Sequence, residues 1–178
     1  DDSLALTQVF FDSPADFIKI IIGIHENHFL MDYFINMNHW DNSYESVITN
    51  ESRVVIKICA IINLISFNNY VVNVIIFTIL GYIGIVLTIR SLALLYPSKY
   101  ITHLFWSVIL FPSIFIWSAG VLKEPLILLG IGMFLFGILS IHKKKEKKWF
   151  YWFLLSLGLV ILLKVKFYIF CCILPTVI

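Results

Sequence analysis

The chain opens on two adjacent carboxylates, Asp1 and Asp2. Side chains of this type on an external loop can act as a general base or bind a divalent cation. A solvated acidic loop would have the same composition, so chemistry and simple exposure both remain open. Asp1 and Asp2 are the candidate catalytic residues of the chain.

A second candidate site is the turn that contains Lys123 and Glu124. Glu124 directly precedes a predicted helix, where the helix dipole stabilises a carboxylate without any functional role. The same turn also gathers Trp117, Ser118 and Gly120 beside a cation and an anion. Such a group can hold a sugar or a phosphate at a membrane surface, so Trp117, Lys123 and Glu124 are candidate substrate ligands.

Lys164 and Lys166 form a third candidate group, at the end of a predicted span. Long cationic side chains in this position can simply extend to the lipid headgroups. Two ammonium groups can also pair with a lipid-linked phosphate as point charges. Arg53 and Lys57, four residues apart on one predicted helix face, leave the same two interpretations open.

The histidines do not predict a metal site. His25 and His28 have no third ligand at a familiar spacing, and no metal ligand is assigned. The segment His39-Trp40-Asp41-Asn42 places aromatic and polar groups side by side. That combination is typical of surfaces that stack on sugar rings.

The cysteines and the motif content exclude several classes of protein. Cys59, Cys171 and Cys172 lie in apolar surroundings without metal-ligand spacing, so buried, inert thiols are expected. The sequence has no Walker loop, no Rossmann glycine pattern, no CxxC pair and no Ser-His-Asp order. Nucleotide-binding enzymes and soluble hydrolases are not indicated, and no nucleic acid partner is expected.

The composition indicates a membrane protein. Hydrophobic residues make up 60% of the chain, charged residues 13%, and the mean hydropathy is +0.93. A chain of this size has too little interior to shield that much apolar surface from water. The expected fold class is therefore an all-α, polytopic integral membrane protein with about four to six transmembrane helices and interfacial amphipathic helices in an external loop.

The uneven charge distribution predicts an orientation. Nine of the eleven acidic residues lie within residues 1–52, whereas five lysines lie within residues 142–148. Lysine-rich turns mark the cytoplasmic side of a membrane. Alternating the spans from this turn places Arg90 and Lys99 inside as well, and places residues 1–52 and the turn at 123–124 on the non-cytoplasmic side.

The predicted elements follow from hydropathy and helix signals. Residues 1–52 are expected to form the external loop, with an amphipathic helix over 14–24 that begins at Ser13-Pro14 and is too short to span. Residues 53–67 are expected to form an interfacial helix, ended by Asn68-Asn69. Residues 70–178 are expected to form a bundle with spans at 70–89, 101–120, 125–141 and 149–163 and a partial span at 167–178. The chain is expected to be a fragment, preceded by at least one further membrane helix.

The order of these features carries a family resemblance. Acidic residues open an external loop, an interfacial helix follows, and Ser52-Arg53 to Asn63 leads into a span. A span with a central Pro112, an outer turn with Glu124, a basic inner turn and a span ending in Leu163-Lys164 come next. This layout resembles the amino-terminal half of GT-C-type membrane glycosyltransferases, which use polyprenyl-phosphate sugars. The segment from Pro112 to Glu124 is also similar to bacterial envelope-polysaccharide membrane proteins.

The resemblance implies specific roles and partners. It implies a catalytic base at Asp1 or Asp2, a carboxylate at Glu124 that helps hold a metal or the acceptor, and a donor-phosphate contact at Lys164. It implies sugar transfer on the outer face of a bacterial cytoplasmic membrane, with a divalent cation as an open question. The expected partners are the bilayer, a polyprenyl-linked sugar and other membrane proteins.

Three alternatives remain open at this point. A polysaccharide polymerase or ligase would use arginines in large outer loops, where this chain has only Arg53. A transporter would have broken helices and charged residues near the middle of the bilayer, and Pro112 is the only hint of a broken helix. A non-catalytic membrane subunit is the third alternative. Clustering of Asp1 or Asp2 with Glu124 and Lys164 would favour the transferase.

Overall fold

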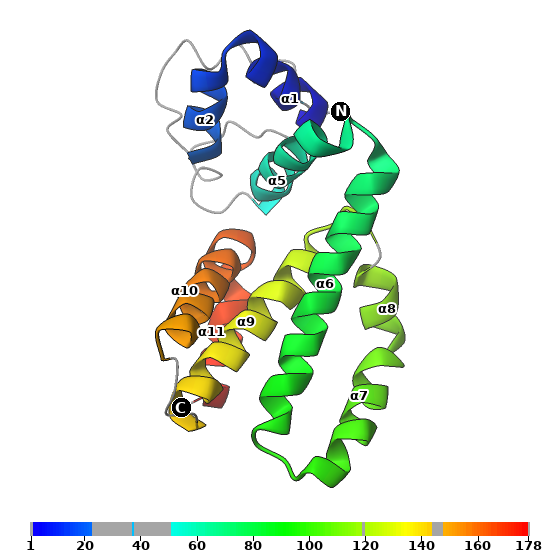
Figure 1. Ribbon diagram of the computed structural model, residues 1–178, viewed down its shortest axis with the longest axis vertical. Helices are drawn as coiled ribbons and strands as arrows, with labels where there is room; N and C mark the ends of the chain where they lie inside the picture. The colour runs from blue at the N-terminus through cyan, green and yellow to red at the C-terminus, as the bar shows by residue number, and fades with distance from the viewer. Residues whose placement is uncertain (1, 23–36, 38–50, 119, 144–147, 178) are drawn as a thin grey trace. The chain divides into compact units, whose positions relative to one another are not determined.

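The computed structural model describes residues 2–22, 37, 51–118, 120–143 and 148–177 (Figure 1). Within these ranges every regular element is a helix and none is a strand, which confirms the all-α prediction for the described residues. The chain divides into two compact units, unit 1 (Asp1–Asn73) and unit 2 (Val74–Ile178).

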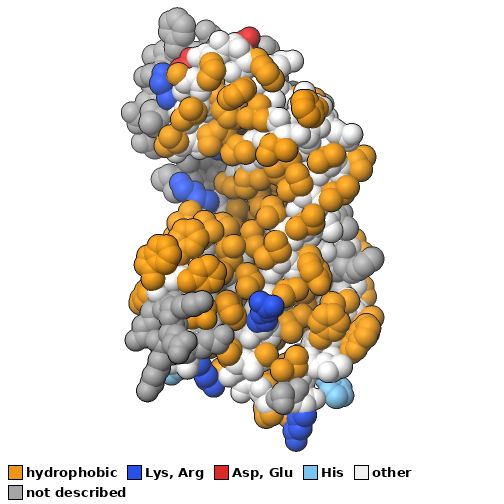
Figure 2. All heavy atoms as spheres, viewed as in Figure 1, with side chains coloured by type: hydrophobic (Ala, Val, Ile, Leu, Met, Phe, Trp, Pro, Cys, Tyr) orange, Lys and Arg blue, Asp and Glu red, His pale blue; other side chains and the backbone are white. Residues whose placement is uncertain are grey.

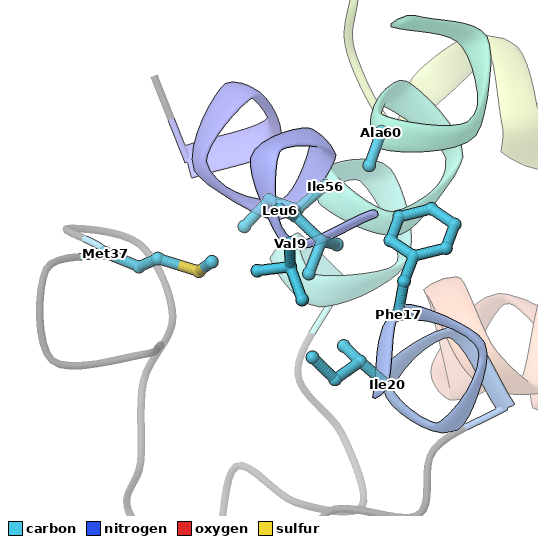
Figure 3. Packing of buried hydrophobic residues seen from close by; sticks show 7 residues of the cluster. All are labelled: Leu6, Val9, Phe17, Ile20, Met37, Ile56 and Ala60. Carbon is cyan, nitrogen blue, oxygen red and sulfur yellow. The ribbon is translucent and has the colours of Figure 1, made fainter. Parts of the chain in front are cut away.

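In its described residues, unit 1 packs three helices around one small core. These are α1 (Asp2–Asp12), α2 (Pro14–Ile22) and α5 (Glu51–Ser66), joined by the first turn of α6 (Tyr70–Ala93). Each helix contributes one face to the core, which consists of Leu6, Val9, Phe17, Ile20, Met37, Ile56 and Ala60 (Figure 3). The ring of Phe10 meets that of Phe17 edge to face, with the centroids 5.3 Å apart.

Helix α1 lies where the sequence predicted only an external loop. Its buried residues Leu6 and Val9, with Phe10 packed beside them, follow the i, i+3, i+4 spacing of an apolar helix face. Asp2 and Asp12 at the two ends of the segment hid this short pattern, because they give it the composition of a loop. The tertiary contact with α5 stabilises a helix that eleven residues would not form alone.

Helix α2 (Pro14–Ile22) begins at Pro14, as predicted, and residues 23 and 24 of the predicted helix lie outside the described residues. It buries Phe17 and Ile20 in the core of unit 1 and leaves Ile18 and Ile22 exposed. The apolar face predicted to lie on the membrane is therefore divided, since part of it packs against protein.

Helix α5 and the joint after it agree closely with the predicted helix over 53–67 and the break at Asn68-Asn69. Phe67 and Asn68 adopt left-handed backbone angles, with φ of 51° and 62°, which end α5. The side-chain oxygen Oδ1 of Asn69 then accepts a hydrogen bond of 3.0 Å from the backbone N–H of Val71. Asn69 thus caps the start of α6.

Unit 2 contains the rest of α6 and six further elements. They are η1 (Ser98–Tyr100), α7 (Ile101–Ile109), α8 (Pro112–Ser118), α9 (Glu124–Lys143), α10 (Lys148–Val165) and α11 (Phe167–Val177). Among the described residues, α6 and α9 are long and apolar enough to cross a membrane, with 24 and 20 residues. The apolar part of α10, Trp149–Val165, is shorter.

The segment 101–120, predicted as one span, is divided in the structure. Helix α7 ends at Ile109, and α8 begins at Pro112. A proline disfavours helical angles in the residue before it, here Phe111, and has no N–H to continue the backbone ladder. Neither α7, with nine residues, nor α8, with seven, has the length of a span by itself. The total of four to six spans stays a prediction.

Glycines allow the helices of unit 2 to approach one another closely. A Cβ on Gly137 would lie 2.9 Å from the backbone nitrogen of Leu155, and one on Gly130 would lie 3.1 Å from Leu162. A Cβ on Gly84 of α6 would fall on the backbone of α9 at Leu128. Small residues at helix contacts are the usual means by which helices pack in lipid. Hydrophobic side chains also predominate on the face shown in Figure 2.

Candidate functional site

Of the two candidate catalytic residues, Asp1 and Asp2, the structure describes only Asp2. Asp1 lies outside the described residues. Asp2 lies in the first turn of α1, where the helix dipole stabilises a carboxylate, and only 7% of the residue is exposed. Asp2 is therefore a buried acidic residue at a helix start, whereas the sequence predicted an external loop.

A buried polar network lies beside Asp2. The hydroxyl of Thr7 donates to the carbonyl oxygen of Ser3 at 2.7 Å. The Nδ2 of Asn63 on α5 lies 3.4 Å from both Ser3 Oγ and Thr7 Oγ1, to which it donates. In turn, Asn63 Oδ1 accepts from Nδ2 of Asn73 on α6, and Ser66 Oγ donates to Asn73 Oδ1 at 2.9 Å. The network fixes the start of α1 against the joint between α5 and α6.

Arg53 lies toward the other end of α5. It is ten residues before Asn63, which is about 15 Å along a helix. Arg53 is buried, and the Nζ of Lys57 one turn later donates to the carbonyl oxygen of Ile21 at 3.4 Å. Lys57 thus binds a carbonyl near the end of α2, where cations are favoured. Unit 1 keeps Asp2 and Arg53 apart, so these two candidates do not share one site there.

In unit 2, the packing of α9 on α10 brings four candidate residues to one end. Gly137 faces Leu155 and Gly130 faces Leu162, so the two helices run antiparallel. The start of α9 consequently lies beside the end of α10. Lys123 and Glu124 at the former are at the same end of the helix pair as the lysines at the latter, Lys164 and Lys166.

The exposure of these four residues suits a site at an aqueous boundary. Lys164 is exposed, whereas Lys123, Glu124 and Lys166 are half-buried. The ammonium group of Lys166 lies 5.5 Å from the centroid of the Tyr168 ring, a cation–π distance. Glu124 is the only acidic residue among the described residues of unit 2. One carboxylate and three ammonium groups give this end a net positive charge that would attract an anion.

The opposite end of unit 2 carries the basic turns. Gly81 meets Pro125, and Gly84 meets Leu128, so α6 and α9 run parallel. Arg90, near the end of α6, therefore lies at the same end of unit 2 as Lys143, at the end of α9. The two positions thus share one end of the unit, and their placement on the cytoplasmic side of a membrane stays a prediction.

Trp117 lies on α8, and its side chain is outside what the structure describes. Helix α8 packs against α9. Ser118, the next residue, places its Cβ 3.6 Å from where a Cβ of Gly81 would lie. The backbone of Trp117 is thus close to the start of α9, as the sequence predicted for the turn before Glu124.

The prediction of buried thiols is right for one cysteine. Cys59 is buried in unit 1, and this burial raises the pKa of its thiol to about 11. Cys171 and Cys172 are exposed on α11, which corrects the expectation for these two. Apolar neighbours in the sequence indicated burial in protein, but in α11 they surround cysteines on an outward surface.

The described residues bring together no group of three His, Cys, Asp or Glu side chains that could hold a metal ion. Divalent magnesium and calcium require several oxygen ligands, which Glu124 alone does not supply. His25, His28 and the aromatic segment 39–42 lie outside the described residues.

Sequence reasoning missed the polar network between α1, α5 and α6. The signal was present, because Asn63 and Asn73 are amides within otherwise apolar helices. Buried amides require hydrogen-bond partners, which predicts that they face other polar groups.

Comparison of the chain with protein-family models, curated proteins and solved structures finds no match.

Proposed function

We propose that this chain is part of a polytopic protein of a bacterial cytoplasmic membrane that transfers a sugar from a polyprenyl-phosphate donor to an acceptor on the outer face. The proposed fold is that of a GT-C-type glycosyltransferase. Spans in addition to α6 and α9, including α10 and the α7–α8 segment, are part of this proposal. An inward orientation of the turn at 142–148 follows from its five lysines.

The observation that supports the proposal is the end of unit 2 that gathers Lys123, Glu124, Lys164 and Lys166. These residues come from positions about forty apart in the sequence and lie at the same end of the helix pair because α9 and α10 are antiparallel. A membrane helix pair needs no charge at its ends for packing. Three ammonium groups and one carboxylate at the same end suit a ligand that carries both a phosphate and hydroxyl groups, as a lipid-linked sugar does.

The proposed mechanism assigns a role to each candidate. Asp1 or Asp2 takes the proton of the acceptor hydroxyl as its oxygen attacks the anomeric carbon, and the bond from that carbon to the phosphate oxygen breaks. The polyprenyl phosphate leaves with the bonding electrons. Lys164, with Lys166 and Lys123, stabilises the negative charge that grows on the phosphate. Glu124 accepts hydrogen bonds from the sugar or the acceptor.

The test is a transfer assay on the full-length protein in membranes, with a radiolabelled polyprenyl-phosphate sugar as donor. Loss of a general base reduces the rate by about 10²–10⁴-fold, so Asp1→Asn/Asp2→Asn should lose activity to that extent. Asp12→Asn is the matched control, because Asp12 is an exposed acid at the other end of the same helix. Full activity in the double variant would end the assignment of the base.

A second variant tests the phosphate site separately. Lys164→Gln removes an exposed cation without disturbing the core and should lower the transfer rate by about 10²-fold through the lost charge stabilisation. Lys99→Gln, an exposed lysine in the η1 turn, should leave the rate unchanged. Equal effects of both changes would show that only overall charge matters.

A further inference from the structure

An exposed apolar ridge runs along the joint between α5 and α6 in unit 1. The ridge consists of Ile61, Ile65, Phe67, Tyr70 and Val71, which are exposed by 42%, 73%, 91%, 67% and 62%. Ile61 and Ile65 are one turn apart on α5, so they share a face. Five large apolar side chains exposed within eleven residues leave an apolar surface that is unfavourable in water.

Three polar side chains of the same joint are buried, whereas Asn68 and Asn69 at the break itself are exposed. Asn63, Ser66 and Asn73 are buried and hydrogen-bonded to one another. Asn63 also reaches Ser3 and Thr7 of α1. The inner side of the joint is thus polar, and its exposed side is apolar except at Asn68 and Asn69.

Four backbone N–H groups of the joint also donate hydrogen bonds within it. The N–H of Asn68 donates to the carbonyl oxygen of Asn63 at 3.3 Å, and that of Asn69 to Ser66 at 3.0 Å. The N–H of Asn73 donates to Asn69 at 3.3 Å, and the N–H of Val71 donates to the Asn69 side chain. A helix break in contact with lipid needs these bonds, because no water is present there to replace them.

The position of the ridge along the chain points to its partner. Tyr70 is the first residue of α6, which is long and apolar enough to cross a membrane. Five residues reach at most about 18 Å, so Ile65 cannot lie farther than that from the start of α6. If α6 crosses the bilayer, the ridge must lie at the bilayer boundary.

We propose that the α5–α6 ridge inserts into the acyl-chain region of the outer leaflet, with the lipid bilayer as its occupant. Ile61, Ile65 and Phe67 contact the acyl chains, and Tyr70 lies at the headgroup level, where its amphipathic ring is favoured. The inference rests on the membrane insertion of α6 in the proposed function, but it does not depend on glycosyl transfer. In this proposal, the last turns of α5 anchor unit 1 to the membrane surface.

The test places a nitroxide label at single cysteines in the full chain, reconstituted in phosphatidylcholine–phosphatidylglycerol vesicles. Cys171 and Cys172 are exposed and are replaced by serine, whereas Cys59 is buried and is retained. Labels at Ile65→Cys and Phe67→Cys report on the ridge. Ile79→Cys, half-exposed within α6, reports on the span, and Gln8→Cys, exposed on α1, is the matched polar control.

The measured quantity is the ratio of collisions with oxygen, which dissolves in lipid, to collisions with a water-soluble nickel complex. We expect this ratio at Ile65 and Phe67 to exceed that at Gln8 by about tenfold, and to approach the ratio at Ile79. A lipid-like value at Ile79 with water-like values at Ile65 and Phe67 would overturn the ridge and leave the span intact. Water-like values at all sites would contradict both the insertion of the ridge and the membrane span of α6. Low collision rates with both reagents at the ridge would indicate a protein partner and also contradict the proposal.

Discussion

Asn63 and Asn73 are joined by a hydrogen bond from the Nδ2 of Asn73 to the Oδ1 of Asn63. The bond connects the last turns of α5 to the first turn of α6 across the left-handed residues Phe67 and Asn68. Because Asn63 also donates to Ser3 and Thr7, one amide side chain joins three helices. The orientation of α1, and with it the position of Asp2, depends on this side chain.

Replacement of Asn63 by leucine should therefore destabilise unit 1. The change keeps the side-chain volume but leaves the buried amide of Asn73 without its acceptor and removes the donor from Ser3 and Thr7. A buried polar group left without a partner costs about 1–3 kcal/mol. Chemical unfolding followed by circular dichroism measures the difference.

Gln8→Leu is the control for this experiment. Gln8 is exposed on α1, so the same kind of exchange there should change the free energy of unfolding by no more than about 0.5 kcal/mol. An equal loss of stability in both variants would mean that hydrophobicity, rather than the network, determines the result.

Replacement of Gly84 by alanine should disrupt the pairing of α6 with α9. The new Cβ would fall on backbone atoms of Leu128, which cannot rotate away. Overpacking of this kind costs about 1–3 kcal/mol. The expected result is a lower temperature of thermal unfolding in detergent.

Gly120→Ala is the matched substitution for Gly84→Ala. A Cβ on Gly120 would meet only the side chain of Leu122, at 3.5 Å, which is an ordinary contact. Its thermal unfolding should match that of the unchanged protein. If Gly84→Ala were equally harmless, the close crossing of α6 and α9 would be wrong.

The exposed ion pair of α2 predicts a direction of pH dependence. The hydrogen bond from Lys19, at 2.8 Å, and a second from Ser13 lower the pKa of the Asp16 carboxyl below its usual value. A carboxyl with a lowered pKa stabilises the fold above its unfolded pKa of about 3.9, and this contribution is lost as the pH falls through the lower folded value.

The pH dependence is measured by comparing the unchanged protein with Asp16→Asn. The difference in unfolding free energy should be constant near neutral pH and should shrink toward zero as the pH falls below about 4. A difference that grows on acidification would contradict the assigned direction of the pKa shift.

The sequence predicted the bounds of several helices better than it predicted how the helices of unit 1 pack. The boundaries of α5, α6 and α9 follow from local signals, such as Asn68-Asn69 and Pro125, so they were found to within a few residues. Helix α1 was missed because its apolar face is short and flanked by acids. It is stabilised by residues more than fifty positions away, such as Ala60 and Asn63, and no local pattern reveals such contacts.

Some features of the candidate site could likewise be predicted from the sequence, and others could not. The placement of Glu124 and Lys164 at the same end of unit 2 could be predicted, because consecutive apolar helices joined by a short turn run antiparallel. The burial of Asp2 could not, since it results from the contact of α1 with α5. The division of segment 101–120 at Pro112 was signalled by the proline, but its outcome depends on how α8 packs against α9.

We propose that unit 2 crosses a membrane with Lys123 and Glu124 at one end and Arg90, Lys99 and Lys143 at the other. The most direct measurement is the labelling of single cysteines by a membrane-impermeant maleimide added to the outer face of intact cells, in the Cys171→Ser/Cys172→Ser background. Lys123→Cys should be labelled at once, and Lys99→Cys only after permeabilisation. Labelling of both positions, or of Lys99→Cys alone, in intact cells would contradict the claim.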